Sequence, residues 1–135
     1  MTDFQFNDGG RAEAGYKGYA GDCVCRAIAI ALELDYKETY LQLARLNKIA
    51  LGKRSARNGV AKDAYEKFLK DHGWVWYKAP KFVGRKAKHY DMPEGVVIAR
   101  MAKHLAAVVD GVVHDTWDST QKMVYGYYAP ATLQD

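Results

Sequence analysis

The chain predicts an α+β domain in which helices come first and antiparallel strands follow. Stretches with helical periodicity occupy residues 23–72, and short runs rich in β-branched and aromatic residues follow from residue 74 onward. The dipeptide Asp110-Gly111 stands between two of these runs and is a strong signal for a tight hairpin. This order is typical of helices packed on one sheet.

The length of 135 residues suits one domain with a single core. Residues 1–15 contain several glycines and no sustained period, so we expect a flexible N-terminal arm at 1–15 and a single domain at 16–135. No stretch reaches the roughly 18 apolar residues that a membrane span requires, and the start has no secretory signal pattern. We therefore expect a cytoplasmic protein with no membrane association.

The first helix is predicted at 23–34. Ala, Ile, Leu, Val and Cys occupy nearly every face of this stretch, interrupted by Arg26 and Glu33, which indicates a central helix buried on most sides. Asp22 precedes it and is a suitable N-cap. Asp35 and Glu38 have the spacing of a capping box and predict a second helix at 36–47. A third helix is expected at 60–72, ending before Gly73.

Strands are predicted at 74–77, 95–101, 104–109, 112–117 and 124–128. A two-residue turn at Asp110-Gly111 sets the register of the hairpin, so that His104 lies opposite Trp117. Opposed side chains share a face of the sheet, and Asp115 is then one diagonal step from His104. Asp118 points to the other face in this register, although a bulge of one residue would exchange the two.

A thiol at a helix start, an imidazole at a strand start and a carboxylate on the returning strand are the components of a cysteine hydrolase. The N-terminus of a helix and a neighbouring imidazolium both lower the pKa of a thiol. We therefore expect Cys23 to be the nucleophile, His104 to accept its proton and Asp115 to orient the ring. Asp118 is the alternative third member. Trp117 either covers the imidazole–carboxylate bond as a wall of the site or belongs to the core.

The remaining thiol has a different expected role. Cys25 lies two positions deeper in the same helix and should face packing, as most free cysteines do. The two cysteines cannot form a disulfide with each other without distorting the helix, and free thiols fit a reducing compartment. No set of Cys and His residues stands at the spacing of a structural zinc site, and neither a metal nor an organic cofactor is implied.

Two segments resemble the small papain-like cysteine peptidase domains of bacteria and their phages: 22–31, which reads DCVCRAIAIA, and 103–119, which contains KHL and VHDTWDS. The resemblance implies a papain-like fold with the nucleophile on the central helix, packed on a C-terminal antiparallel sheet. It also implies hydrolysis of a peptide, isopeptide or amide bond. Members of this superfamily carry a glutamine before the cysteine as an oxyanion donor, and this chain has none there. Lys17 and Asp22 are the candidates for that role, with backbone N–H groups of Gly18, Gly21 or Cys23.

The charge distribution supports a second reading. The chain carries a formal charge of +4, yet residues 45–88 contain thirteen Lys or Arg and three acids. The alternative function is therefore a non-catalytic module of the same fold that binds nucleic acid or an acidic protein through this segment. The expected contacts come from basic residues and nearby aromatic rings: Lys53, Arg54, Arg57, Lys81, Arg85, Lys86 and Lys88, with Trp74, Trp76 or Tyr77. A thiol transferase resembling transglutaminases would use the same triad. The substrate and the oligomeric state stay open.

Overall fold

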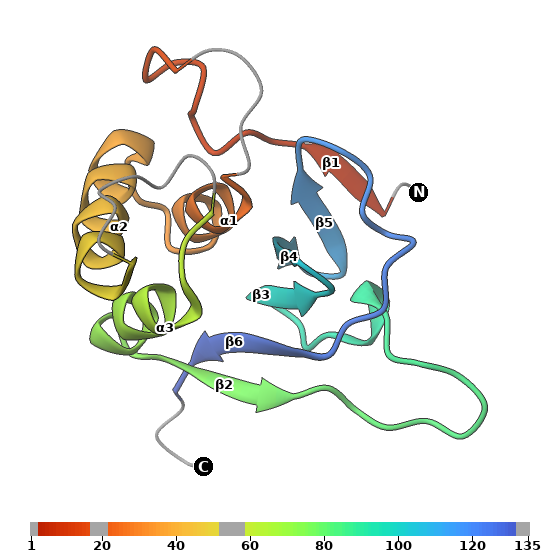
Figure 1. Ribbon diagram of the computed structural model, residues 1–135. Helices are drawn as coiled ribbons and strands as arrows, with labels where there is room; N and C mark the ends of the chain where they lie inside the picture. The colour runs from red at the N-terminus through yellow and green to blue at the C-terminus, as the bar shows by residue number, and fades with distance from the viewer. Residues whose placement is uncertain (1–2, 17–21, 52–58, 132–135) are drawn as a thin grey trace.

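The computed structural model describes residues 3–16, 22–51 and 59–131. Its helices are α1 (Cys23–Ala31), α2 (Tyr36–Leu51), α3 (Lys62–Asp71) and a short 3-10 helix, η1 (His89–Asp91). Its strands are β1 (Phe4–Phe6), β2 (Trp74–Lys78), β3 (Val96–Met101), β4 (His104–Val109), β5 (Val112–Asp115) and β6 (Gly126–Pro130). The predicted α+β class is confirmed. Figure 1 shows the three α-helices on one side of the sheet.

The six strands form one mixed sheet in the order β1-β5-β4-β3-β6-β2. The hairpin of β4 and β5 has the predicted register, with Val109 paired to Val112 and Ala107 to His114. Both turn residues have positive φ, 48° at Asp110 and 83° at Gly111, as a type I′ turn requires. The register that fixes His104 and Asp115 is thus set by two residues of the turn.

Strand β1 was not predicted. It lies within the arm expected at 1–15 and pairs in parallel with β5, Gln5 opposite His114. The sheet is therefore mixed, whereas a wholly antiparallel one was expected. Three residues are too few for a recognisable period-two pattern, so this strand depends on its neighbour for its conformation. The chain directly after β1 also contacts the site, because the Asn7 N–H donates to the carbonyl of Asp115 at 2.9 Å.

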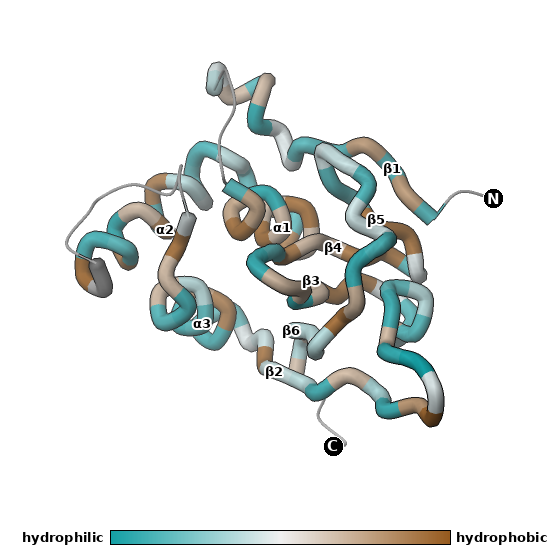
Figure 2. Tube along the Cα trace, turned by 45° about the vertical axis from the view of Figure 1, so that its right-hand side comes forward, coloured by the Kyte–Doolittle hydropathy of each residue, from teal (hydrophilic) through white to brown (hydrophobic). Residues whose placement is uncertain are grey.

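Helix α1 is the central helix, as predicted. It packs against β4, and most of its residues are buried, including Cys25, Ile28 and Arg26. Figure 2 shows hydrophobic residues concentrated where α1 meets the middle of the sheet. The far face of the sheet has its own apolar cluster around Val97, Val108 and Val113. Two packed layers thus hold the start of α1 against the start of β4.

The helix boundaries differ modestly from the predicted ones. Helix α1 ends at Ala31 because Glu33 adopts φ of 54°, and the Leu34 N–H bonds back to the carbonyl of Ala29. This is a Schellman-type ending with Glu in the position where Gly is usual. Helix α2 continues to Leu51, beyond the predicted end at 47. Among the residues that the structure describes, none of the helices has the length and hydropathy needed to cross a bilayer.

Candidate active site

Cys23 is the first residue of α1 and is half-buried. Its sulfur interacts with the side chain of His104 and with the backbone of Leu105, and both interactions lower the pKa of the thiol. The first residues of a helix also present N–H groups that have no partner within the helix. The thiol therefore lies where a negative charge is stabilised from several directions.

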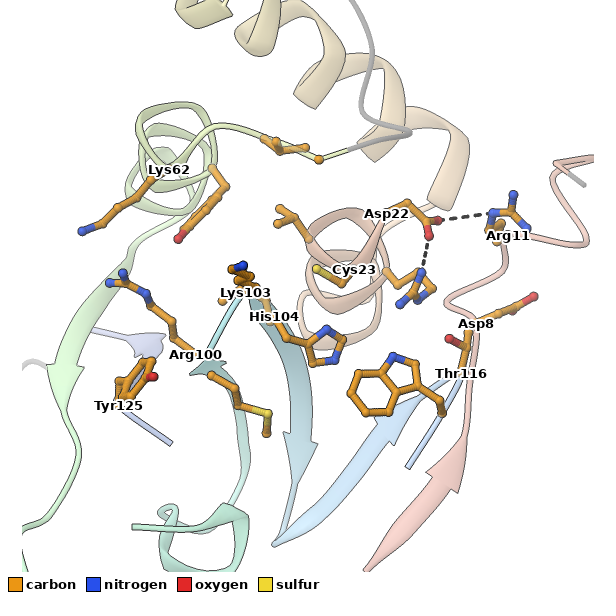
Figure 3. Close-up of a pocket in the computed structure, with 18 of the residues that line it drawn as sticks. Asp8, Arg11, Asp22, Cys23, Lys62, Arg100, Lys103, His104, Thr116 and Tyr125 are labelled. Carbon is orange, nitrogen blue, oxygen red and sulfur yellow. Dashed lines mark hydrogen bonds and ion pairs between the residues drawn. The ribbon is translucent and has the colours of Figure 1, made fainter. Parts of the chain in front are cut away.

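His104 is the first residue of β4 and follows the tight turn at Ala102-Lys103, where Lys103 has φ of 53°. Its Nε2 lies 2.6 Å from the Oδ2 of Asp115. Since Nε2 is engaged by this carboxylate, Nδ1 is the ring nitrogen that faces the thiol. The structure thus brings Cys23, His104 and Asp115 together, with the imidazole in the middle (Figure 3 shows the first two).

Asp115 ends β5 and is almost fully buried. Besides His104 it accepts hydrogen bonds from the Thr116 N–H at 2.8 Å and from the Ser119 hydroxyl at 3.1 Å. Asp118, the alternative third member, is exposed and accepts from the N–H and hydroxyl of Thr120 instead. The regular hairpin register explains this difference, because no bulge exchanges the two carboxylates.

Trp117 packs against the imidazole, with the ring centroids of Trp117 and His104 4.8 Å apart. Its side chain is 45% exposed, so it is a wall of the site and not part of the core. An indole against the imidazole reduces the access of water to the ring, which strengthens the electrostatic interactions of the ring with its partners.

The pKa values follow from these contacts. Burial alone raises the pKa of the Cys23 thiol, but the hydrogen bonds from His104 and Leu105 and the charges of His104 and Arg26 bring it below the ordinary value. Burial lowers the pKa of His104, but the bonds to Asp115 and Cys23 raise it to about 9. Burial raises the pKa of Asp115, and the bond to His104 outweighs it, so that this carboxyl stays ionised. These directions favour a thiolate–imidazolium pair at neutral pH.

Cys25 behaves as predicted for a packing residue. Its side chain has no exposed surface, and its sulfur lies 3.9 Å from the carbonyl oxygen of Tyr36. Burial, together with the negative charge of Asp22, raises the pKa of this thiol to about 12. A thiol with that pKa is protonated and unreactive at neutral pH.

Arg26, which interrupts the apolar pattern of α1, belongs to a buried network of charged residues next to the site. Arg26 pairs with the carboxylate of Asp22, and its other terminal nitrogen lies 3.4 Å from Asp115. The Tyr36 hydroxyl also donates to Asp22, and Arg11 lies 3.3 Å from it. The sequence signal was an arginine within an otherwise apolar helix. The network ties the start of α1 to the end of β5.

The predicted roles of Asp22 require correction. It precedes α1, but its side chain makes no capping hydrogen bond because it is committed to Arg26. A buried carboxylate that accepts hydrogen bonds is no donor to an oxyanion. Lys17, Gly18 and Gly21 lie outside the described residues. The donor that remains from the sequence-based candidates is the backbone N–H of Cys23.

Cys23 and His104 line a cleft of about 850 Å³. Figure 3 shows Cys23 and His104 between two sets of side chains, Lys62 and Arg100 on one side and Asp22 and Arg11 on the other. Aromatic and apolar groups complete the walls, among them Val60, Tyr65, Trp117 and Tyr125. A cleft of this size accommodates a segment of a peptide or a ligand of similar size.

The basic segment at 45–88 gives less support to the alternative reading. Arg85 is exposed but forms a two-point ion pair with Asp91, and Lys88 donates to the carbonyl of Gln121. Trp74, one of the expected stacking rings, is buried in the core. Lys53, Arg54 and Arg57 lie outside the described residues.

Comparison of the chain with protein-family models, with curated proteins and with solved structures found no significant match. The fold and the site define an α+β protein in which a thiol and an imidazole border a cleft and a carboxylate is hydrogen-bonded to the imidazole.

Proposed function

We propose that this protein is a thiol-dependent hydrolase of peptide, isopeptide or amide bonds, with a papain-like arrangement of its elements. The observation that carries the proposal is the position of the His104 ring, which is bonded to Asp115 through Nε2 and also interacts with the Cys23 thiol. A cysteine kept for packing alone needs neither an imidazole nor a cleft beside it.

In the proposed reaction, the Cys23 thiolate attacks the carbonyl carbon of the substrate. The C–S bond forms as the carbonyl π electrons move onto oxygen, and the helix-start N–H of Cys23 stabilises that oxyanion. Collapse of the tetrahedral intermediate expels the amine, which takes its proton from the His104 imidazolium. Water, deprotonated by the neutral His104 ring, then attacks the thioester, releases the carboxylic acid and restores the thiol.

Each neighbour has a distinct role in this scheme. Asp115 accepts a hydrogen bond from Nε2 and so holds the His104 ring in the tautomer that leaves Nδ1 free for the sulfur. Trp117 packs against the same ring. Arg26 touches Asp115 and no reacting atom, so we regard it as a positioning residue. An acyl acceptor other than water would make the same site a transferase.

The proposal is tested with p-nitrophenyl acetate, a small activated ester. We expect p-nitrophenolate release together with an acetyl adduct on Cys23, detected by mass spectrometry of the digested protein, which decays as water hydrolyses it. Cys23→Ala should abolish the adduct, and Cys25→Ala, which removes the buried thiol, should retain it. An undiminished adduct in the Cys23→Ala variant, or none in the wild type, would refute the assignment.

A further inference from the structure

The charges around the cleft are distributed unevenly. Among the described residues, the carboxylates that line it are those of Asp8 and Asp22. Asp22 is paired with Arg26 and Arg11, and Asp8 accepts the N–H groups of Gly10 and Ala12. Both therefore lie in the part of the wall that is already neutralised or bonded.

Within the described ranges, another part of the wall carries three cations from separate segments of the chain. Lys62 is the first residue of α3, Arg100 belongs to β3, and Lys103 stands in the turn directly before His104. Within the part of the chain that the structure describes, no ion pair forms with any of the three side chains. Figure 3 shows the charged ends of Lys62 and Arg100 on the same side of Cys23. This set of residues is called the cationic wall below.

The cationic wall is not an arbitrary set of surface lysines. It shares one cleft with the thiol, and the guanidinium of Arg100 is held 5.6 Å from the centre of the Trp76 ring. Tyr65 and Tyr125 line the same cleft and supply apolar surface next to the charges. Like charges that converge without an internal counterion raise the local concentration of anions and favour a ligand that brings the missing negative charge.

We propose that the cationic wall is a substrate subsite that selects peptides with a carboxylate side chain close to the scissile bond. This inference rests on the proposed function, because it assigns specificity to the acylation of Cys23. An acidic peptide fits better than nucleic acid, since the charges border the same cleft as the thiol proposed for acyl transfer.

The test uses tripeptide acyloxymethyl ketones, which alkylate an activated thiol. Glutamate and glutamine are exchanged at each of the three positions, so that each pair of probes differs in one charge. At one position or more, we expect the glutamate probe to label wild-type Cys23 about tenfold faster, which corresponds to 1.4 kcal/mol. The preference should weaken with added salt.

Matched variants identify the residues responsible. The double variant Lys62→Gln/Lys103→Gln should reduce the ratio of the glutamate rate to the glutamine rate toward unity, because the glutamate carboxylate loses two of its cationic partners. Lys70→Gln, which removes an exposed charge from the same helix as Lys62, should retain the full preference. Circular dichroism confirms that each variant is folded.

The outcomes are separable. Labelling of Cys23 at equal rates by glutamate and glutamine probes at every position would overturn the subsite and leave the proposed hydrolase intact. A preference that survives in the double variant would also overturn it, as would suppression of labelling by an oligonucleotide without any preference for glutamate. No labelling of Cys23 by any probe would remove the proposed function itself, and the subsite with it.

Discussion

Replacement of Asp115 by asparagine tests how His104 is kept charged. The pKa of His104 is raised from 6.5 to about 9, although burial acts in the opposite direction. A difference of that size corresponds to roughly 3 kcal/mol in favour of the charged ring. The Asp115 carboxylate contributes through a 2.6 Å hydrogen bond and through its charge, and the Cys23 thiolate supplies further stabilisation. Loss of the carboxylate charge should therefore remove a large share of this energy.

The expected result for Asp115→Asn is a pKa of His104 clearly below the wild-type value of about 9, together with a higher pKa for the Cys23 thiol, because a less populated imidazolium gives the thiolate less support. The pKa of His104 is measured by NMR titration of its ring protons between pH 5 and 11, and that of Cys23 from thiolate absorbance. At neutral pH, alkylation of Cys23 by iodoacetamide should slow accordingly.

The matched control is Asp118→Asn. It removes a carboxylate three positions further along the chain that bonds to Thr120 and not to His104. This variant should keep the wild-type titration of His104. A natively folded Asp115→Asn protein whose His104 still titrates near 9 would refute the electrostatic account of the site.

Other variants probe stability, measured by urea unfolding. Arg26→Met removes the cation that two buried carboxylates share and should cost about 3–5 kcal/mol. Arg85→Met removes one partner of an exposed ion pair and should cost much less, so similar losses in both variants would contradict the buried network. Gly126→Ala would place a methyl carbon in steric overlap with two atoms of the Trp76 ring and 2.7 Å from the carbonyl oxygen of Tyr77, and should cost about 1–3 kcal/mol. A neutral result would show that both neighbours shift without cost. The raised folded-state pKa of His104 means that its stabilising contribution is complete below pH 6.5 and is lost as the pH rises through about 9. His104→Gln should therefore destabilise the protein more at pH 6 than at pH 10, and the reverse order would exclude this linkage.

The hairpin shows what short-range sequence information could predict. Asp110 and Gly111 specify a turn whose geometry determines the pairing of both strands, so the distance relation between His104 and Asp115 follows from two residues. The start of α2 is similar, since the Glu38 N–H bonds to the Asp35 side chain, as a capping box predicts.

The missed features depend on contacts between distant segments. Strand β1 forms because it pairs with β5, and its three residues alone contain no pattern that predicts this pairing. The end of α1 carries Glu33 in the left-handed region, where the sequence has no glycine to mark it. Asp22 was predicted to be a cap because it directly precedes α1. Its side chain instead bonds to Arg26, Arg11 and Tyr36, and the contacts with Arg11 and Tyr36 form only when separate segments of the chain pack together.

The order of assembly along the chain has a consequence for redox chemistry during synthesis. During synthesis, Cys23 leaves the ribosome well before His104, which lies on β4. The imidazole that lowers the pKa of the thiol therefore reaches the sulfur only after β4 has packed against α1. Until then, Cys23 of the nascent chain has an ordinary thiol that is mostly protonated at neutral pH and reacts slowly with oxidants and electrophiles. The thiol therefore becomes reactive when His104 docks beside it, and the rate at which an electrophile modifies that sulfur reports when the sheet has formed.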